Sequence, residues 1–271
     1  MDTTIIQTIH PFLLEDLEDV CEVEPADWDM LIAQMRWYLS TPYCFPLKAV
    51  HGEALFCGLG NALMHQGTGW IGNIHVAPRF RAMGVREKLV RGLVVELESR
   101  GCTTVSVMAQ PEEQAMYEAE GFAIDCAYVM YDEGKCEAPT LDEVELYEPH
   151  HALGVLHLDK KASGEDRRVL ISEHSYASRI YVEKQRTLAN YIVMLGEGLI
   201  IAQRPDAGHE LLRWLLPMDK RVMIPETNRD AVEFLELRGY KVTRRELRMY
   251  RGAKLDWHPE MLYGRISAHL G

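Results

Sequence analysis

The chain has 271 residues, of which 47% are hydrophobic, and it carries a formal net charge of -12 at neutral pH. A chain of this length can bury one large or two medium cores, and its excess of acid argues against a dedicated nucleic-acid-binding protein. No apolar run approaches the roughly 20 residues that a membrane helix needs, and the N-terminus has no basic segment followed by an apolar one. We expect a cytoplasmic protein without nucleic-acid or membrane partners.

The first half of the chain alternates between helix and strand patterns. We expect a short strand over residues 3–8, followed by helices over residues 13–23 and 28–39. From residue 45 to residue 77, apolar and β-branched runs are broken at HGE and HQGTG. This pattern predicts three strands joined by tight turns.

Helical spacing follows these strands. Apolar residues recur at every fourth position from Val85 to Leu97, which predicts a helix that Gly101 ends. We then expect a strand over residues 102–109, a short helix over 111–121 with Pro in its first turn, and a strand over 122–132. Antiparallel strands that lead into a strand, helix and strand describe an α+β domain with a mixed sheet.

The charges are unevenly distributed between the two halves. Residues 1–139 hold 9 Lys and Arg against 21 Asp and Glu, whereas residues 140–271 hold 20 of each kind. Five of the nine basic residues in the first half fall within thirteen positions: Arg79, Arg81, Arg86, Lys88 and Arg91. This basic cluster indicates that an anionic ligand binds locally, while the acidic surroundings suit a cationic second ligand.

The cysteines and histidines give no metal signal. All six cysteines stand singly without a CxxC pair, which argues against a zinc site and against a disulfide framework. His150 and His151 are adjacent, but neighbours in sequence seldom converge on one ion, and no carboxylates with ligand spacing accompany them. We expect reduced, packed thiols and no metal.

Three features of the first half follow one another in a recognisable order. A strand ending in IHVAP precedes a basic turn that opens a helix, and a second short helix carries a spaced series of polar and aromatic residues. The residues concerned are Arg81, Gly84, Gln110, Tyr117, Gly121 and Phe122. This arrangement resembles the GCN5-related N-acetyltransferases. The resemblance implies a mixed, largely antiparallel sheet flanked by helices, with acetyl-coenzyme A as co-substrate and a primary amine as acceptor.

The chain departs from the family's pattern at three positions. The family's second signature is Asn-x-x-Ala-x-x-x-Tyr-x-x-x-Gly-Phe, so Gln110 replaces its Asn and Glu113 replaces its Ala. In the loop Arg-x-x-Gly-x-Gly/Ala, Arg86 stands at the last, small position. The side chain of Arg86 either points outward and reaches a coenzyme A phosphate, or points inward and blocks the pocket.

The second half repeats part of the first. Asn228, Gly239 and Tyr240 each lie 118 residues after Gln110, Gly121 and Phe122. Self-similarity at so long a period predicts two copies of one fold in tandem. The second copy has Leu235 in place of Tyr117, and between its strand (198–205) and its helix (206–216) it has no comparable glycine loop.

The second half therefore resembles the degenerate C-terminal domain of tandem bacterial acetyltransferases, which implies that only the first copy holds the cofactor. We place the boundary in the acidic connector at residues 136–143, with domains at 1–139 and 140–271.

The resemblance implies a coenzyme A site built from the strand, the loop and the second signature. A helix start offers unpaired N–H groups and a positive dipole end to a diphosphate, and Gly84 allows the backbone to approach it closely. The residues so implied are Ile74, His75, Val76, Arg81, Ala82, Met83, Gly84, Val85, Arg86, Glu87, Gln110 and Tyr117. A backbone N–H of the strand is also positioned to stabilise an oxyanion.

Only a few residues are candidates for the general acid and the general base. The resemblance implies that Tyr117 protonates the departing thiolate; the alternative is a Tyr packed inside the helix. An amine with a pKa of about 10.4 is neutral only about once in 2,500 molecules at pH 7, so a base is needed. His75 and Glu53 are candidates, His75 has a structural alternative, and the base stays unassigned.

Aromatic residues could shape an acceptor site, although core packing is the favoured interpretation for those of the strand and the second helix. Trp70 and Gly72 lie on the strand before the loop, and Trp28, Trp37 and Tyr38 lie on the second helix. Trp257 and Tyr263 lie in a C-terminal tail, which we expect to pack back on a domain and to close the acceptor cleft.

Two functions remain open at this stage. The first is an N-acetyltransferase that moves the acetyl group directly to a primary amine of a small molecule or a peptide. The second is a catalytically inactive sensor or interaction protein that keeps the fold and coenzyme A binding. A longer acyl donor, the identity of the amine and a homodimeric state also stay open.

Overall fold

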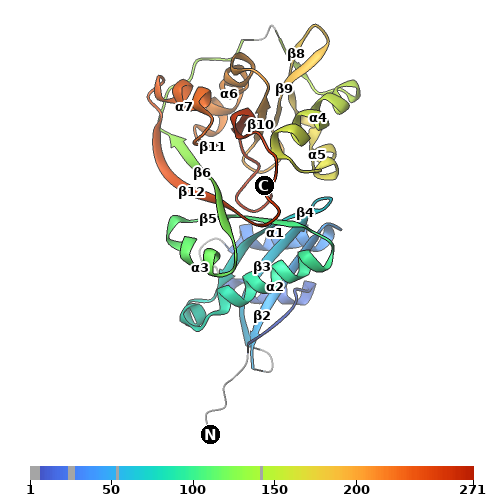
Figure 1. The fold of residues 1–271 in the computed structure, drawn as a ribbon, viewed down its shortest axis with the longest axis vertical. Coiled ribbons are helices and arrows are strands. Elements are labelled where there is room, and N and C mark those ends of the chain that lie inside the picture. The colour runs from blue at the N-terminus through green and yellow to red at the C-terminus, as the bar shows by residue number, and fades with distance from the viewer. Residues whose placement is uncertain (1–6, 24–27, 53–54, 141–142) are drawn as a thin grey trace.

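A computed structural model describes residues 7–23, 28–52, 55–140 and 143–271 (Figure 1). Most of the strand expected over residues 3–8 lies outside these ranges, and the first described strand is β1 (Gln7–Pro11). No helix in the described ranges is both long and apolar enough to cross a membrane.

The helices expected near the N-terminus are present, but the first is a 3-10 helix, η1 (Leu14–Glu22). Its buried residues Leu17 and Val20, and Val23 after it, are spaced by three, which is the period of a 3-10 helix. The second helix is α1 (Trp28–Ser40).

The remaining expected elements of the first half are confirmed within a few residues. Strands β2 (Cys44–His51), β3 (Leu55–Met64) and β4 (Thr68–Val76) lead into the short η2 (Pro78–Met83) and helix α2 (Val85–Ser99). Strand β5 (Thr104–Ala109), the turn η3 (Pro111–Glu113), helix α3 (Gln114–Ala119) and strand β6 (Ala123–Asp132) follow.

The large sheet is mixed, as expected. Its eight strands have the order β1-β2-β3-β4-β5-β12-β6-β11, and β4 and β5 are its parallel pair. Helix α2 covers one face through Leu89, Leu93 and Leu97, all fully buried. Glycines on the strands make room for it, because a Cβ at Gly60 would lie 2.9 Å from Leu93, and one at Gly69 would lie 2.7 Å from Leu97.

The second half contributes its own elements. Its described helices are α4 (Ala152–Ser163), α5 (Arg168–His174), α6 (Pro205–Asp219) and α7 (Arg229–Glu236), with short 3-10 turns η4 (Pro149–His151), η5 (Ser175–Ala177) and η6 (Pro259–Met261). Its strands are β7 (Val144–Leu146), β8 (Arg179–Glu183), β9 (Arg186–Ile192), β10 (Leu199–Ala202), β11 (Val222–Pro225), β12 (Lys241–Gly252) and β13 (Leu262–Gly264). Five of them form an antiparallel sheet in the order β13-β10-β9-β8-β7.

The two halves exchange strands. Strand β12 of the second half lies between β5 and β6 of the first and pairs antiparallel with both, while β6 pairs in turn with β11 (Figure 1). By sequence position, β6 and β12 correspond in the two repeats, because each follows the helix of the repeated segment, α3 or α7. The strand of the second repeat is therefore inserted into the sheet of the first, and the strand of the first repeat pairs with one of the second. The repeat spacing alone did not predict this exchange.

One continuous hydrophobic cluster contains buried residues from both halves. It includes Leu63 and Ile71 of the first half and Leu158, Ile171 and Leu270 of the second. The boundary at residues 139 and 140 falls in the connector between β6 and β7, and it stays a prediction.

Candidate active site

Strands β4 and β5 separate along their length. Their parallel ladder consists of the pairs Thr68–Thr104, Gly69–Val105 and Trp70–Ser106. Beyond these pairs β4 continues to Val76 and β5 to Ala109. Gly72, His75 and Val76 stay paired with β3 on the other side. The edge of β4 that faces β5 is therefore open to a ligand that can pair with backbone groups.

A β-bulge interrupts β4 where the two strands part. The register with β3 shifts between Leu59 and Asn61, and Asn73 has a φ of 49°, in the left-handed region. The side chain of Asn73 donates to Gln34 and to the hydroxyl of Tyr38, both at 2.8 Å. A bulge releases a backbone N–H from the ladder and redirects it. The hydrogen bonds from Asn73 to Gln34 and Tyr38 of α1 hold this irregular backbone in place.

The glycine loop has the backbone geometry expected of an anion site. Gly84 has a φ of 69° and joins η2 to the fifteen-residue α2, with no side-chain cap on that helix start. A Cβ at Gly84 would meet only Glu87, at 3.8 Å, so the space beside the loop is open. Arg81 donates its Nε to the carbonyl of Val76 at 3.3 Å and ties the loop to the end of β4. Ala82 and Met83 are exposed, whereas Val85 is buried.

Arg86 reaches from the start of α2 to the other signature. Its Nη1 lies 2.7 Å from Oε1 of Glu113, with both side chains partly exposed. The other carboxylate oxygen of Glu113 accepts the backbone N–H of Gln110 at 3.3 Å. Two of the three replaced positions of the family's pattern, Arg86 and Glu113, thus pair with each other.

Tyr117 lies beneath this ion pair. It is only 2% exposed and packs edge to face on Phe122, with ring centroids 5.6 Å apart. Burial, together with the charge of Glu113, raises the pKa of Tyr117 well above its ordinary value, although a hydrogen bond from Arg86 opposes the shift. The phenol therefore keeps its proton at neutral pH.

The C-terminal tail covers the face of β4 opposite α2. A Cβ at Gly72 would collide with His269, and one at Gly271 would lie 2.7 Å from the indole nitrogen of Trp70. His269 packs edge to face on Tyr38 of α1. Burial lowers the pKa of His269 to about 4, and Arg265 and His75 add to the shift. Because the half-buried His75 acts on His269, it lies on the tail-covered face of β4. Side chains alternate between the two faces of a strand, so this face is the one away from α2.

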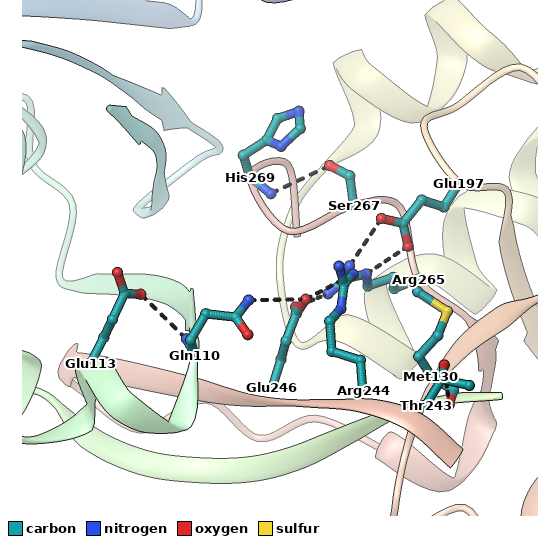
Figure 2. Close-up of polar contacts among 10 residues, drawn as sticks. All are labelled: Gln110, Glu113, Met130, Glu197, Thr243, Arg244, Glu246, Arg265, Ser267 and His269. Carbon is teal, nitrogen blue, oxygen red and sulfur yellow. Dashed lines mark hydrogen bonds and ion pairs between the residues drawn. The ribbon is translucent and has the colours of Figure 1, made fainter. Parts of the chain in front are cut away.

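A polar network missed by the sequence analysis begins at the end of β5 (Figure 2). Gln110 donates its Nε2 to Glu246 of β12 at 3.5 Å, and Arg244 lies 2.9 Å from the same carboxylate oxygen. Arg265 pairs with Glu246 and, through Nε and Nη2, with both oxygens of Glu197 at 2.8 and 2.9 Å. Glu246 is 2% exposed. Nothing in the local sequence RREL distinguishes it, because the strand exchange alone brings it here.

The aromatic residues named from the sequence separate into two groups. Tyr38 is buried and Trp37 half-buried in α1, and the ring of Trp257 lies 3.8 Å from the guanidinium of Arg248, which also faces Trp70. Tyr263 packs instead against Gly208 of α6, away from the cleft. Glu53 and the side chain of Trp28 lie outside the described residues.

Glu145, His150 and His151 gather in the second half, with ligand atoms within 4.8 Å of one another. The backbone N–H of Glu148 donates to Nδ1 of His151 at 3.0 Å, which leaves the proton of the neutral ring on Nε2. That nitrogen faces Glu145 at 3.5 Å. The arrangement is that of a proton donor beside a carboxylate.

Residues 11–122 match the model of the family described as "Acetyltransferase (GNAT) family". No curated protein matches the chain at a significant level. The solved structure of a candidate acetyltransferase from Pyrococcus horikoshii is similar over 100% of this chain and 99% of its own, with 21% identity and a TM-score of 0.81. A GCN5-related N-acetyltransferase from Sphaerobacter thermophilus is similar over 93% of this chain and 98% of its own, with 13% identity and a TM-score of 0.61.

The family match falls on the half that carries the loop, the open strand edge and Tyr117, while the structural likeness extends over both halves. Residues 11–122 therefore form a domain that matches the GNAT acetyltransferase family, within a chain whose full length shares the fold of the Pyrococcus horikoshii structure.

Proposed function

We propose that the chain transfers an acetyl group from acetyl-coenzyme A directly to a primary amine, in the opening between β4 and β5. The observation that carries this proposal is the short β4–β5 ladder, because three residue pairs join two strands that both continue beyond it. The edge of β4 beyond the ladder, at residues 74–76, can then hydrogen-bond an extended pantetheine arm.

The loop and the second signature would hold the rest of the cofactor. The first turn of α2 supplies backbone N–H groups next to Gly84, where the open space admits a diphosphate. Residues 81–87 form this cradle, with Gln110 and Tyr117 on the other side of the opening. The acyl-coenzyme A supplies the activated thioester carbonyl.

The residues around the opening suit direct transfer. A backbone N–H redirected by the bulge at Asn73 would stabilise the oxyanion, and the neutral Tyr117 would donate a proton to the departing thiolate. His75, on the tail-covered face of β4, is a candidate for removing the acceptor's proton, directly or through water. This assigns His75 to the acceptor side and Tyr117 to the thiol side.

Five of the six thiols are poor candidates for a covalent intermediate. Burial raises the pKa of Cys44 to about 12 and that of Cys102 to about 11, and it also raises those of Cys57, Cys126 and Cys136. A protonated thiol is a weak nucleophile, which favours attack by the amine itself.

The test is release of free thiol from acetyl-coenzyme A against a panel of amines that spans small amines, amino acids, aminoglycosides and lysine peptides. We expect release with at least one class, and unchanged turnover in each of six Cys→Ala variants. Tight cofactor binding without turnover on any amine would favour the inactive sensor, for which the closed Arg86–Glu113 ion pair is the supporting observation.

A further inference from the structure

Arg86 and Glu113 replace small residues of the family's pattern, and in this structure they bind each other at 2.7 Å. Arg86 belongs to α2, which follows β4, and Glu113 ends η3, which follows β5. Because β4 and β5 part before these elements begin, the ion pair bridges the two sides of the opening.

The side chains of Arg86 and Glu113 differ in how firmly the structure holds them. Both oxygens of Glu113 are engaged, one with Arg86 and one with the backbone N–H of Gln110, so the carboxylate is fixed to the start of η3. Arg86 is a long side chain that is 36% exposed. An ion pair this accessible to water changes an equilibrium by no more than about fivefold, so a stronger anion can displace Glu113 from the arginine.

The second repeat provides an internal comparison. Asn228 corresponds to Gln110 by spacing, and three residues later the second repeat has Ala231, which is fully buried, where the first has Glu113. The carboxylate is therefore a property of the repeat that carries the glycine loop, and it occurs together with the arginine that it binds.

We propose that Arg86 is a diphosphate ligand that Glu113 holds in place until coenzyme A arrives. The phosphates, which carry more charge than one carboxylate, take the guanidinium from Glu113 and place it beside the first turn of α2. Glu113 thus neutralises Arg86 in the free protein and competes with the cofactor for it. This inference rests on the proposed function, because it takes coenzyme A as the ligand of the loop.

Calorimetric titration with coenzyme A tests the exchange. Glu113→Gln keeps an oxygen for the N–H of Gln110 but removes the charge, and we expect it to bind coenzyme A about threefold more tightly. Arg86→Ala should bind about tenfold more weakly, since it loses a charged hydrogen bond to phosphate. The double variant should match Arg86→Ala, because Glu113 acts only through Arg86.

The ion pair between Arg91 and Glu120 offers a matched control. It also joins α2 to the end of α3, at 3.3 Å, but one turn further from the loop. Glu120→Gln should leave the affinity for coenzyme A unchanged. Pantetheine, which lacks the diphosphate, should bind equally to the wild type and to Arg86→Ala.

The outcomes separate this inference from the function on which it rests. If Arg86→Ala binds coenzyme A as tightly as the wild type or more tightly, the arginine blocks the pocket or does not contact the diphosphate, and the exchange is wrong while the cofactor site stands. An unchanged affinity in Glu113→Gln would also contradict it. If no protein, including the wild type, binds coenzyme A, both the exchange and the proposed function fail.

Discussion

The indole Nε1 of Trp70 donates to both carboxylate oxygens of Glu165, at 3.1 Å each. Trp70 lies on β4 where the ladder with β5 ends, and Glu165 lies in the turn between α4 and α5 of the second half. Burial alone would raise the pKa of Glu165, but neighbouring cationic groups, including Arg167 and Arg248, hold it below its ordinary value. An ionised, 2% exposed carboxylate therefore fastens the second half to the proposed reaction site.

Replacing Glu165 by Ala should destabilise the whole chain. The change leaves the indole and the Thr68 hydroxyl without their acceptor. It also removes a buried negative charge that faces Arg167 and Arg248, which keep only Asp159 and Asp125 as ion-pair partners. We expect a loss of about 3 kcal/mol in the free energy of unfolding, measured with urea. The exposed Glu112→Ala should cost less than about 0.5 kcal/mol. Equal effects of the two substitutions would contradict this account of Glu165.

The strand exchange predicts that the first half does not fold alone. A fragment of residues 1–139 lacks β12, which pairs with both β5 and β6, so it would expose two unpaired strand edges. We expect this fragment to aggregate or stay unfolded, and co-expression with residues 140–271 to restore a soluble complex. A monomeric fragment with a cooperative melting transition would show that the halves are independent.

Gly84 can be tested against a glycine at the other end of α2. Both Gly84 and Gly101 have a positive φ, of 69° and 91°, and neither has an obstructing neighbour. Ala at either position should lower the free energy of unfolding by about 1 kcal/mol through backbone strain. Only Gly84→Ala should also weaken coenzyme A binding in calorimetry, because its Cβ projects into the space beside the loop. Equal affinities in the two variants would argue against a diphosphate at Gly84.

Tyr117→Phe should slow turnover without loosening the cofactor. General acid catalysis contributes about 100-fold or more, so we expect kcat to fall by that order while coenzyme A affinity stays within about twofold. Tyr131→Phe is a suitable control, since Tyr131 is a buried tyrosine bonded to Glu236. Full activity in Tyr117→Phe would leave the packing role as the remaining explanation for this residue.

Two buried histidines predict acid sensitivity. Burial lowers the pKa of both His65 and His269 from 6.5 to about 4 in the folded chain. Because the folded pKa is the lower one, each contribution to stability is complete above pH 6.5 and is lost as the pH falls toward 4. The slope is about 1.4 kcal/mol per pH unit for each histidine. In urea titrations at several pH values, His269→Gln should show a smaller slope than the wild type, and the exposed His10→Gln should not. Equal slopes would place the sensitivity elsewhere.

The local elements were largely predictable because their signals lie in short segments. The spacing of Val85, Leu89, Leu93 and Leu97 predicted α2, and the fixed distances from Gln110 to Gly121 predicted the turn, short helix and following strand. The same spacing predicted the second repeat. The 3-10 form of residues 14–22 was missed, although the three-residue spacing of Leu17, Val20 and Val23 indicates it.

The long-range arrangement was not predictable in this way. Two strands with similar patterns, β6 and β12, fit either sheet equally well by periodicity, so the exchange depends on tertiary packing. Glu246 lies at the end of β5 because β12 pairs there, while Glu165 and His269 reach β4 through the packing of the second half on the first. The pairing of Arg86 with Glu113 had a usable signal, since both positions depart from one family pattern with opposite charge.

Amide hydrogen exchange with and without acetyl-coenzyme A tests most directly whether the first repeat holds the cofactor. We expect slower exchange in residues 72–76, 81–87 and 110–117 when the cofactor is present, because the strand edge, the loop and the second signature would hold it. Residues 203–210 and 225–236, the corresponding segments of the second repeat, should be unaffected. Protection confined to the second repeat, or no protection at any cofactor concentration, would contradict the claim.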